Sequence, residues 1–138
     1  MIALARNALW WARDYLYAAV WQIRAALNRT DPRTFSDGDR APIVILPGVY
    51  ETWQFMFPLI TAMHDRGHPV HVVQVLHRNR RPVNEAAARV IDYLKANDLR
   101  GCILLAHSKG GLVGKRAMAL DAETGRIARM LAVATPFG

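Results

Sequence analysis

One short stretch carries the residue types needed for nucleophilic catalysis. An apolar run over residues 102–106 stops at His107 and Ser108, and small residues follow before a helical pattern begins at Leu112. Strand, tight turn and helix in this order are the setting in which a serine is exposed on a strained turn. Such a serine lies at a helix N-terminus, where free N–H groups and the positive end of the dipole favour a developing oxyanion. The stretch therefore predicts a nucleophilic serine at position 108.

The residues around Ser108 follow the pattern G-x-S-x-G in all but one position. Ala106 replaces the first glycine, and Gly110 occupies the last. Small residues are required because the chain folds back on itself there, and a bulky side chain would collide with its neighbours. The alternative is an ordinary turn in which Ser108 only caps the helix. With this context the sequence resembles the α/β-hydrolase family, and within it the lipase- and esterase-like members that carry such a nucleophile elbow.

The resemblance extends over roughly residues 40–138 and implies an oxyanion hole made of two backbone N–H groups. One belongs to Lys109, directly after the nucleophile, and the other to Val49, in the loop after an earlier strand. Most relatives have His-Gly before that second position, whereas this chain has Pro47-Gly48. The residues expected to contact substrate are Gly48, Tyr50, Trp53 and His107. For the aromatic residues of this loop, packing in the core is the alternative. The reaction implied, cleavage of a carboxylic ester or lipid, needs no cofactor and no metal.

The chain does not contain the other two members of a serine triad in the family's order, which is nucleophile, acid, histidine. None of the five histidines follows Ser108, and the only acids after it are Asp121 and Glu123. We therefore expect a chain that ends before the catalytic acid and histidine, with little turnover of its own. The competing hypothesis is a non-catalytic fragment that binds a membrane or a partner through a hydrolase-like half-sheet. Whether the natural acceptor is water or an alcohol stays open.

The patterning predicts an α/β fold, a three-layer sandwich with a mostly parallel sheet. Apolar runs predict strands at 42–46, 69–76, 101–106 and 127–134, and the segments between them predict helices at 57–66, 82–97 and 112–121. The alternation implies βαβ units with right-handed crossovers. The expected organisation is an amphipathic helix at 1–29, a polar linker at 30–41 and the N-terminal part of a hydrolase domain at 42–138.

Composition fits one globular domain that is basic overall. The 138 residues are 52% hydrophobic, and 18 Lys and Arg against 11 Asp and Glu give a net charge of +7. The single cysteine, Cys102, lies inside an apolar run, so it forms no disulfide within the chain and is expected in the core. The charge suits an anionic surface, but no nucleic-acid-binding motif is present. The basic residues after the second strand (His77, Arg78, Arg80, Arg81) and the Lys109 side chain are predicted to be solvated.

The N-terminal helix has an unusual stripe in which arginines and aromatic residues share one side. Arg6, Trp10, Arg13, Tyr17, Trp21, Arg24 and Asn28 follow one another at steps of three or four. Charges interrupt the apolar run well before the roughly 20 residues that a membrane span requires. The pattern is typical of a helix lying in a membrane interface. A helix packed on the domain or on a partner chain explains it equally well. The expected location is cytoplasmic or peripherally membrane-associated.

Overall fold

A computed structural model describes residues 2–138, and its centre is a parallel four-stranded sheet. The strands are β1 (Ile43–Leu46), β2 (Val70–Val72), β3 (Cys102–His107) and β4 (Ile127–Val133). Their order is β2-β1-β3-β4, and every pair is parallel. The inner strands β1 and β3 are almost wholly buried, as apolar runs covered on both faces must be. The predicted α/β fold with a parallel sheet is confirmed.

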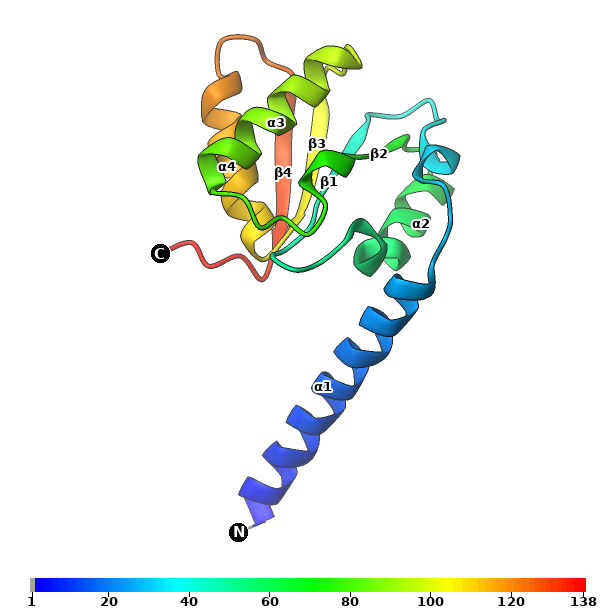
Figure 1. The fold of residues 1–138 in the computed structure, drawn as a ribbon, viewed down its shortest axis with the longest axis vertical. Coiled ribbons are helices and arrows are strands. Elements are labelled where there is room, and N and C mark those ends of the chain that lie inside the picture. Colours follow the sequence, from blue (N-terminus) through cyan, green and yellow to red (C-terminus); the bar gives the residue numbers. More distant parts are fainter. Residues whose placement is uncertain (1) are drawn as a thin grey trace.

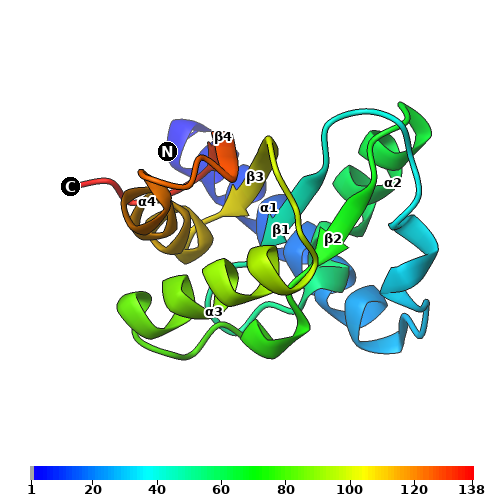
Figure 2. The same cartoon turned by 90° about the horizontal axis from the view of Figure 1, so that it is seen from above.

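Helices cover both faces of this sheet, which gives the predicted three layers (Figure 2). Helices α3 (Val83–Ala96) and α4 (Lys109–Asp121) bury one face, where Val90 and Leu94 pack with Leu104. Helix α2 (Phe57–Asp65) covers the other face together with two 3₁₀ turns, η1 (Pro32–Phe35) and η2 (Trp53–Met56). The active-site loops of such a sheet lie at the carboxyl ends of its strands.

The second strand is much shorter than the predicted segment 69–76. Only Val70–Val72 pairs with β1, and a 3₁₀ turn, η3 (Gln74–Leu76), follows. Val73 and Leu76 are nevertheless buried, at 2% exposure each. The apolar residues that predicted a longer strand therefore reach the core without being part of one. Helix α4 also differs, since it begins at Lys109, three residues before the predicted start. Gly110 and Gly111 do not break it, because both are buried within its first turn.

The long helix α1 (Ile2–Leu27) projects away from the sheet and meets the domain only near its C-terminal end (Figure 1). Ala25 is buried there at 5% exposure, and Trp21 is half-buried. Trp21 therefore faces the domain rather than continuing the outward stripe. Farther out, Trp11 and Leu16 are each more than 60% exposed. No helix among the described residues has an apolar stretch long enough to cross a membrane. Met1, predicted in the same helix, lies outside the described residues.

The segment between α1 and β1 is less uniform than its polar composition indicates. Asp31 caps the turn η1 by accepting a hydrogen bond from the Arg33 N–H group. Phe35 at the end of this turn is 6% exposed and packs edge-on against Trp53 and Phe57. One aromatic residue thus fixes the connection to the face of the sheet that α2 covers.

Candidate active site

Ser108 occupies a strained turn between β3 and α4. Its φ of 49° and ψ of −123° lie in a region that side chains other than glycine rarely adopt, at a cost on the order of 1–3 kcal/mol. The surrounding structure holds this conformation. The Ser108 N–H donates to the Val133 carbonyl at 2.8 Å, and the Ser108 carbonyl accepts from Thr135 Oγ1 at 2.9 Å and from the Gly111 N–H at 3.0 Å. The geometry is that of a serine exposed at a strand-to-helix turn.

Two glycines allow the chain to approach itself closely at this turn. A Cβ atom at Gly110 would lie 2.1 Å from the Leu46 carbonyl oxygen, which no side chain can tolerate. A Cβ atom at Gly48 would lie 3.2 Å from the Cβ atom of Ser108. The loop after β1 and the turn after β3 are therefore in direct contact, and this contact brings the two predicted oxyanion-hole segments together.

The two N–H groups predicted for the oxyanion hole occupy different surroundings. Lys109 is the first residue of α4, and N–H groups of a first helical turn have no partner within their helix. Val49 follows the buried Gly48 and is 41% exposed. Both groups thus belong to segments next to Ser108: Lys109 follows it in the chain, and Val49 follows Gly48, which lies against the serine.

The Lys109 side chain is not a freely solvated group, so that prediction was wrong. Its Nζ donates to the Asn79 carbonyl at 2.8 Å and to the Arg81 carbonyl at 2.6 Å. The Asn79 side chain, 1% exposed, donates from Nδ2 to the Pro47 carbonyl at 2.7 Å. Together these bonds tie the loops after β1 and β2 to the start of α4. Asn79, which the sequence did not single out, is the centre of this connection.

Glu51 is a second residue that the sequence did not reveal. Its Oε2 accepts the Gly48 N–H at 2.8 Å and lies 2.8 Å from Nδ1 of His107. A carboxylate can only accept, so Nδ1 of His107 carries the proton in this contact. The Glu51 side chain is 12% exposed, and it joins the loop after β1 to the residue before Ser108. One signal was available, because Glu51 is the only charged residue in the segment 49–57.

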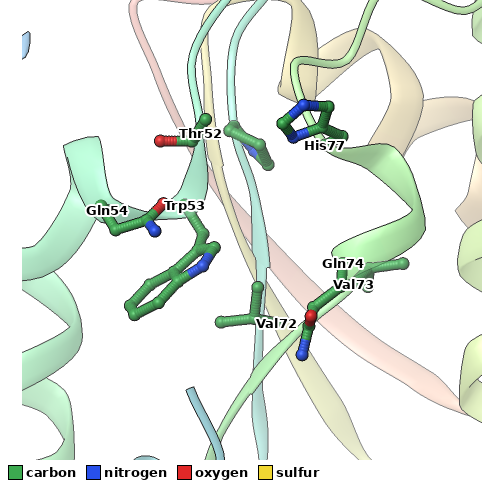
Figure 3. A pocket seen from close by; sticks show the side chains of 8 residues that line it. Thr52, Trp53, Gln54, Val72, Val73, Gln74 and His77 are labelled. Carbon is green, nitrogen blue, oxygen red and sulfur yellow. The ribbon is translucent and has the colours of Figure 1, made fainter. Parts of the chain in front are cut away.

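The predicted substrate-contacting residues divide into two groups. Gly48 and His107 lie beside Ser108, through the contacts described above. Trp53 instead packs against Phe57 and lines a cavity of about 130 Å³ at the carboxyl ends of β1 and β2 (Figure 3). Tyr50 is 62% exposed, and the Arg80 guanidinium lies 5.8 Å from the centre of its ring.

The cavity around Trp53 is separate from the serine. Its other lining residues are Pro47, Thr52, Gln54, Val72, Val73, Gln74 and His77. Ser108 is not among them. Figure 3 shows the indole of Trp53 and the ring of His77 on different elements that border this space. His77, the residue after η3, has a positive φ of 44°.

The acids after Ser108 do not approach it. Asp121 lies at the opposite end of α4, is 3% exposed and accepts the Ile127 N–H at 2.8 Å. It also accepts the Thr124 hydroxyl, so it organises the turn that leads into β4. Glu123 is exposed in that same turn. Neither residue occupies the position of a triad acid.

The remaining histidines serve local contacts. His64 pairs with Asp37, and His68 bonds the Ala41 carbonyl. His71 is half-buried against Tyr93, and this burial lowers the pKa of its imidazole. Among residues 2–138 no three His, Cys, Asp or Glu side chains gather in a way that would hold a metal ion.

Comparison with known proteins gives a match at the level of structure. No protein-family model and no curated protein matches the sequence. A solved structure does: an extracellular α/β-hydrolase from a Paenibacillus species, described as sharing structural and functional homology with tobacco salicylic acid binding protein 2. The two are 25% identical with a TM-score of 0.57 over 70% of this chain. The chain spans 41% of that protein's length. The chain therefore has the α/β-hydrolase type of fold over part of that fold's extent.

Proposed function

We propose that this chain carries the nucleophile half of a serine hydrolase that cleaves carboxylic esters or lipids. The observation that supports the proposal most is the backbone at Ser108, strained between β3 and α4 and held against Gly48. Backbone strain of this kind persists only where the surrounding contacts enforce it, and it is found most often at active and binding sites. An ordinary capping serine requires no such conformation, since a cap residue is normally extended.

In the proposed reaction Ser108 Oγ attacks the carbonyl carbon of the ester. The N–H groups of Val49 and Lys109 donate to the oxygen that becomes negative, and the alcohol leaves as the acyl group stays on Ser108. Water, or an alcohol acceptor, then removes the acyl group. The proposal assigns the base that takes the Ser108 proton, and the acid that orients it, to polypeptide outside this chain. The Paenibacillus hydrolase, of which this chain spans 41%, is consistent with that assignment.

Covalent labelling tests the nucleophile with a well-matched control, because the sequence contains only two serines, Ser36 and Ser108. The full chain is incubated with an alkyl fluorophosphonate, and the adduct is located by intact-mass and peptide mass spectrometry. We expect one adduct, absent in Ser108→Ala and retained in Ser36→Ala. Ser36 is exposed and its hydroxyl donates to the Arg33 carbonyl, so its removal leaves the turn at Ser108 untouched. A chain that stays unlabelled favours the non-catalytic fragment instead.

We further propose that α1 lies on an anionic membrane surface. The projecting part of the helix combines exposed apolar residues such as Trp11 and Leu16 with arginines. The Arg13 guanidinium lies 4.9 Å from the centre of the Trp10 ring, an arrangement that keeps charge and aromatic surface together. Aromatic rings at headgroup depth beside cationic side chains are typical of interfacial helices.

Vesicle flotation of the full chain tests this second proposal. We expect the chain to float with vesicles containing phosphatidylserine and to remain in solution with pure phosphatidylcholine at the same salt. Arg13→Gln should weaken flotation, whereas Arg116→Gln, an exposed change on α4, removes the same charge away from the helix. Equal weakening by both variants would indicate net charge rather than α1, and the proposal would fail.

A further inference from the structure

A cavity of about 160 Å³ lies between α1 and the carboxyl ends of β3 and β4. Five elements contribute to its wall: α1, η2, α2 and the ends of β3 and β4. Its lining residues are Tyr17, Trp21, Phe55, Met56, Pro58, Leu59, His107 and Val133. Most of these side chains are apolar, and the cavity is distinct from the one around Trp53.

The cavity adjoins the candidate nucleophile through two of its lining residues. His107 directly precedes Ser108, and Val133 of the neighbouring strand β4 pairs with His107. The Val133 carbonyl accepts the Ser108 N–H at 2.8 Å. Val133, one of the residues that hold the strained serine in place, therefore also forms one end of the cavity. Phe55 extends this wall, with its ring centre 5.7 Å from that of His107.

The α1 side of the cavity is held in place by contacts along the helix. The rings of Tyr17 and Trp21 meet edge-on with 6.0 Å between their centres, and the Arg24 guanidinium lies 5.1 Å from the Trp21 ring. Trp21 is half-buried, in contrast to Trp11, which is 63% exposed on the same helix. Without α1 this side of the cavity would be open to solvent.

We propose that this cavity binds the acyl chain of the ester that Ser108 attacks, with Trp21 of α1 limiting the chain length. The inference rests on the proposed function of Ser108. An apolar cavity of about 150 Å³ holds a benzene-sized group, which corresponds to an acyl chain of about six carbon atoms. The acyl part is the better occupant than the leaving alcohol, because it stays attached to the serine between the two steps whereas the alcohol must depart.

The first experiment measures binding without reaction. In full-length Ser108→Ala, methyl hexanoate should shift the backbone amide NMR signals of His107 and Val133. Signals of Gln74 and His77, which line the other cavity, serve as the control within the same sample. Saturable shifts confined to the first pair support the proposal. Shifts of equal size at both cavities, or none at His107 and Val133, would overturn it whatever Ser108 does.

The second experiment measures reaction with a series of p-nitrophenyl alkylphosphonates. The Ser108 Oγ–P bond forms, the P–O bond to the aryl group breaks, p-nitrophenolate leaves, and the serine proton passes to the buffer. Each buried CH₂ group is worth roughly a fourfold gain, and the hexyl compound has four more of them than the ethyl compound, so we expect it to react up to about 250-fold faster. The dodecyl compound should react more slowly than the hexyl one, since its chain exceeds the cavity.

Matched variants connect that chain-length profile to α1. Trp21→Ala should move the optimum to longer chains, and Leu59→Phe, at a position 43% exposed, should move it to shorter ones. Trp11→Ala removes the same side chain from the same helix outside the cavity and should leave the profile unchanged. Identical profiles for Trp21→Ala, Leu59→Phe and Trp11→Ala would overturn the inference. If methyl hexanoate binds but no phosphonate reacts, the cavity stands and the proposed nucleophile fails.

Discussion

Glu51 connects the two segments that the proposed oxyanion hole requires. One oxygen of its carboxylate bonds both the Gly48 N–H and His107, so the loop after β1 and the turn at Ser108 share a single acceptor. Each of those hydrogen bonds involves a charged group in a half-buried setting, where charge-assisted bonds are stronger than neutral ones. Glu51 acts through the backbone it positions and does not itself meet the reacting carbonyl.

We predict that Glu51→Ala slows fluorophosphonate labelling of Ser108 by about tenfold, since the Val49 N–H loses its fixed position. The loss should fall on the maximal labelling rate rather than on the reagent concentration that gives half of it. Glu123→Ala, an exposed acid in the turn after α4, is the control and should label normally. A purely structural role would instead lower the midpoint of urea unfolding and leave the labelling rate of the folded protein unchanged.

Cys102 allows a prediction about pH, because it is fully buried at the start of β3. Burial, reinforced by the negative charge of Asp121, raises the pKa of its thiol from 9.0 to about 11. Between these values the thiol ionises in the unfolded chain but not in the folded one. Stability must therefore fall as pH rises above 9, because the unfolded state binds fewer protons.

The measurement compares the wild-type protein with Cys102→Ala by urea unfolding at pH 8, 9 and 10. We expect the wild type to lose about 1 kcal/mol more than the variant between the first and last pH. The variant carries a constant loss from its smaller side chain, so only the difference in slope is informative. Parallel stability curves would show that the buried thiol does not resist ionisation.

The sequence predicts the local part of the site and misses the part built by distant contacts. Ser108, its small neighbours and Gly48 stand out because each is required by the backbone within a few residues of it. Glu51 and His107 are 56 positions apart, and Asn79 bonds Pro47 across 32 positions. No pattern in one sequence shows such a pairing, because it depends on which loops the sheet brings to one edge.

At the scale of elements, apolar runs place β1, β3 and β4 well. In β1 and β3 burial coincides with pairing, whereas most residues of β4 pair with β3 without being buried. The strand predicted at 69–76 is too long, because some of its residues are buried without pairing in the sheet. Val73 and Leu76 reach the core from the 3₁₀ turn and the residue before it. Helix α1 is placed correctly as a helix. Its contacts with η2 come from residues that share a stripe with exposed arginines, and periodicity alone does not distinguish them.

Helix α4 packs unusually close to β1, and Gly110 makes this possible. A Cβ atom at this position would meet the backbone of Leu46, which cannot yield as a flexible side chain would. We predict that Gly110→Ala destabilises the fold by about 1–3 kcal/mol through overpacking, as measured by urea unfolding. It should also displace the start of α4 and so lower the labelling of Ser108.

The control for this change is Gly101→Asn. Gly101 directly precedes β3 in the sequence, a Cβ atom there meets nothing within 4 Å, and its φ of 62° suits asparagine. This variant should remain within about 0.5 kcal/mol of the wild type. Equal stability of the two variants would mean that α4 can retreat from β1 at little cost.

At the scale of the whole molecule, the sheet presents β4 as an unpaired edge. Within residues 2–138 this strand pairs only with β3, and Leu131 and Val133 on it are 59% and 43% exposed. An exposed apolar edge strand offers a row of unpaired N–H and C=O groups to another chain. The net charge of +7 opposes association, and salt screens that repulsion.

We therefore predict that the isolated chain associates as its concentration rises, and more so at high salt, as followed by light scattering after size-exclusion chromatography. Leu131→Lys places a charge on the edge of β4 and should keep the chain monomeric, which is how natural edge strands avoid pairing. Leu120→Lys adds the same charge on α4, at a residue 46% exposed, and should associate as the wild type does after allowance for its charge. If both lysine variants stay monomeric to the same extent, repulsion between like-charged chains controls association and the edge of β4 does not. If only Leu131→Lys prevents it, β4 is the surface through which this chain meets further polypeptide.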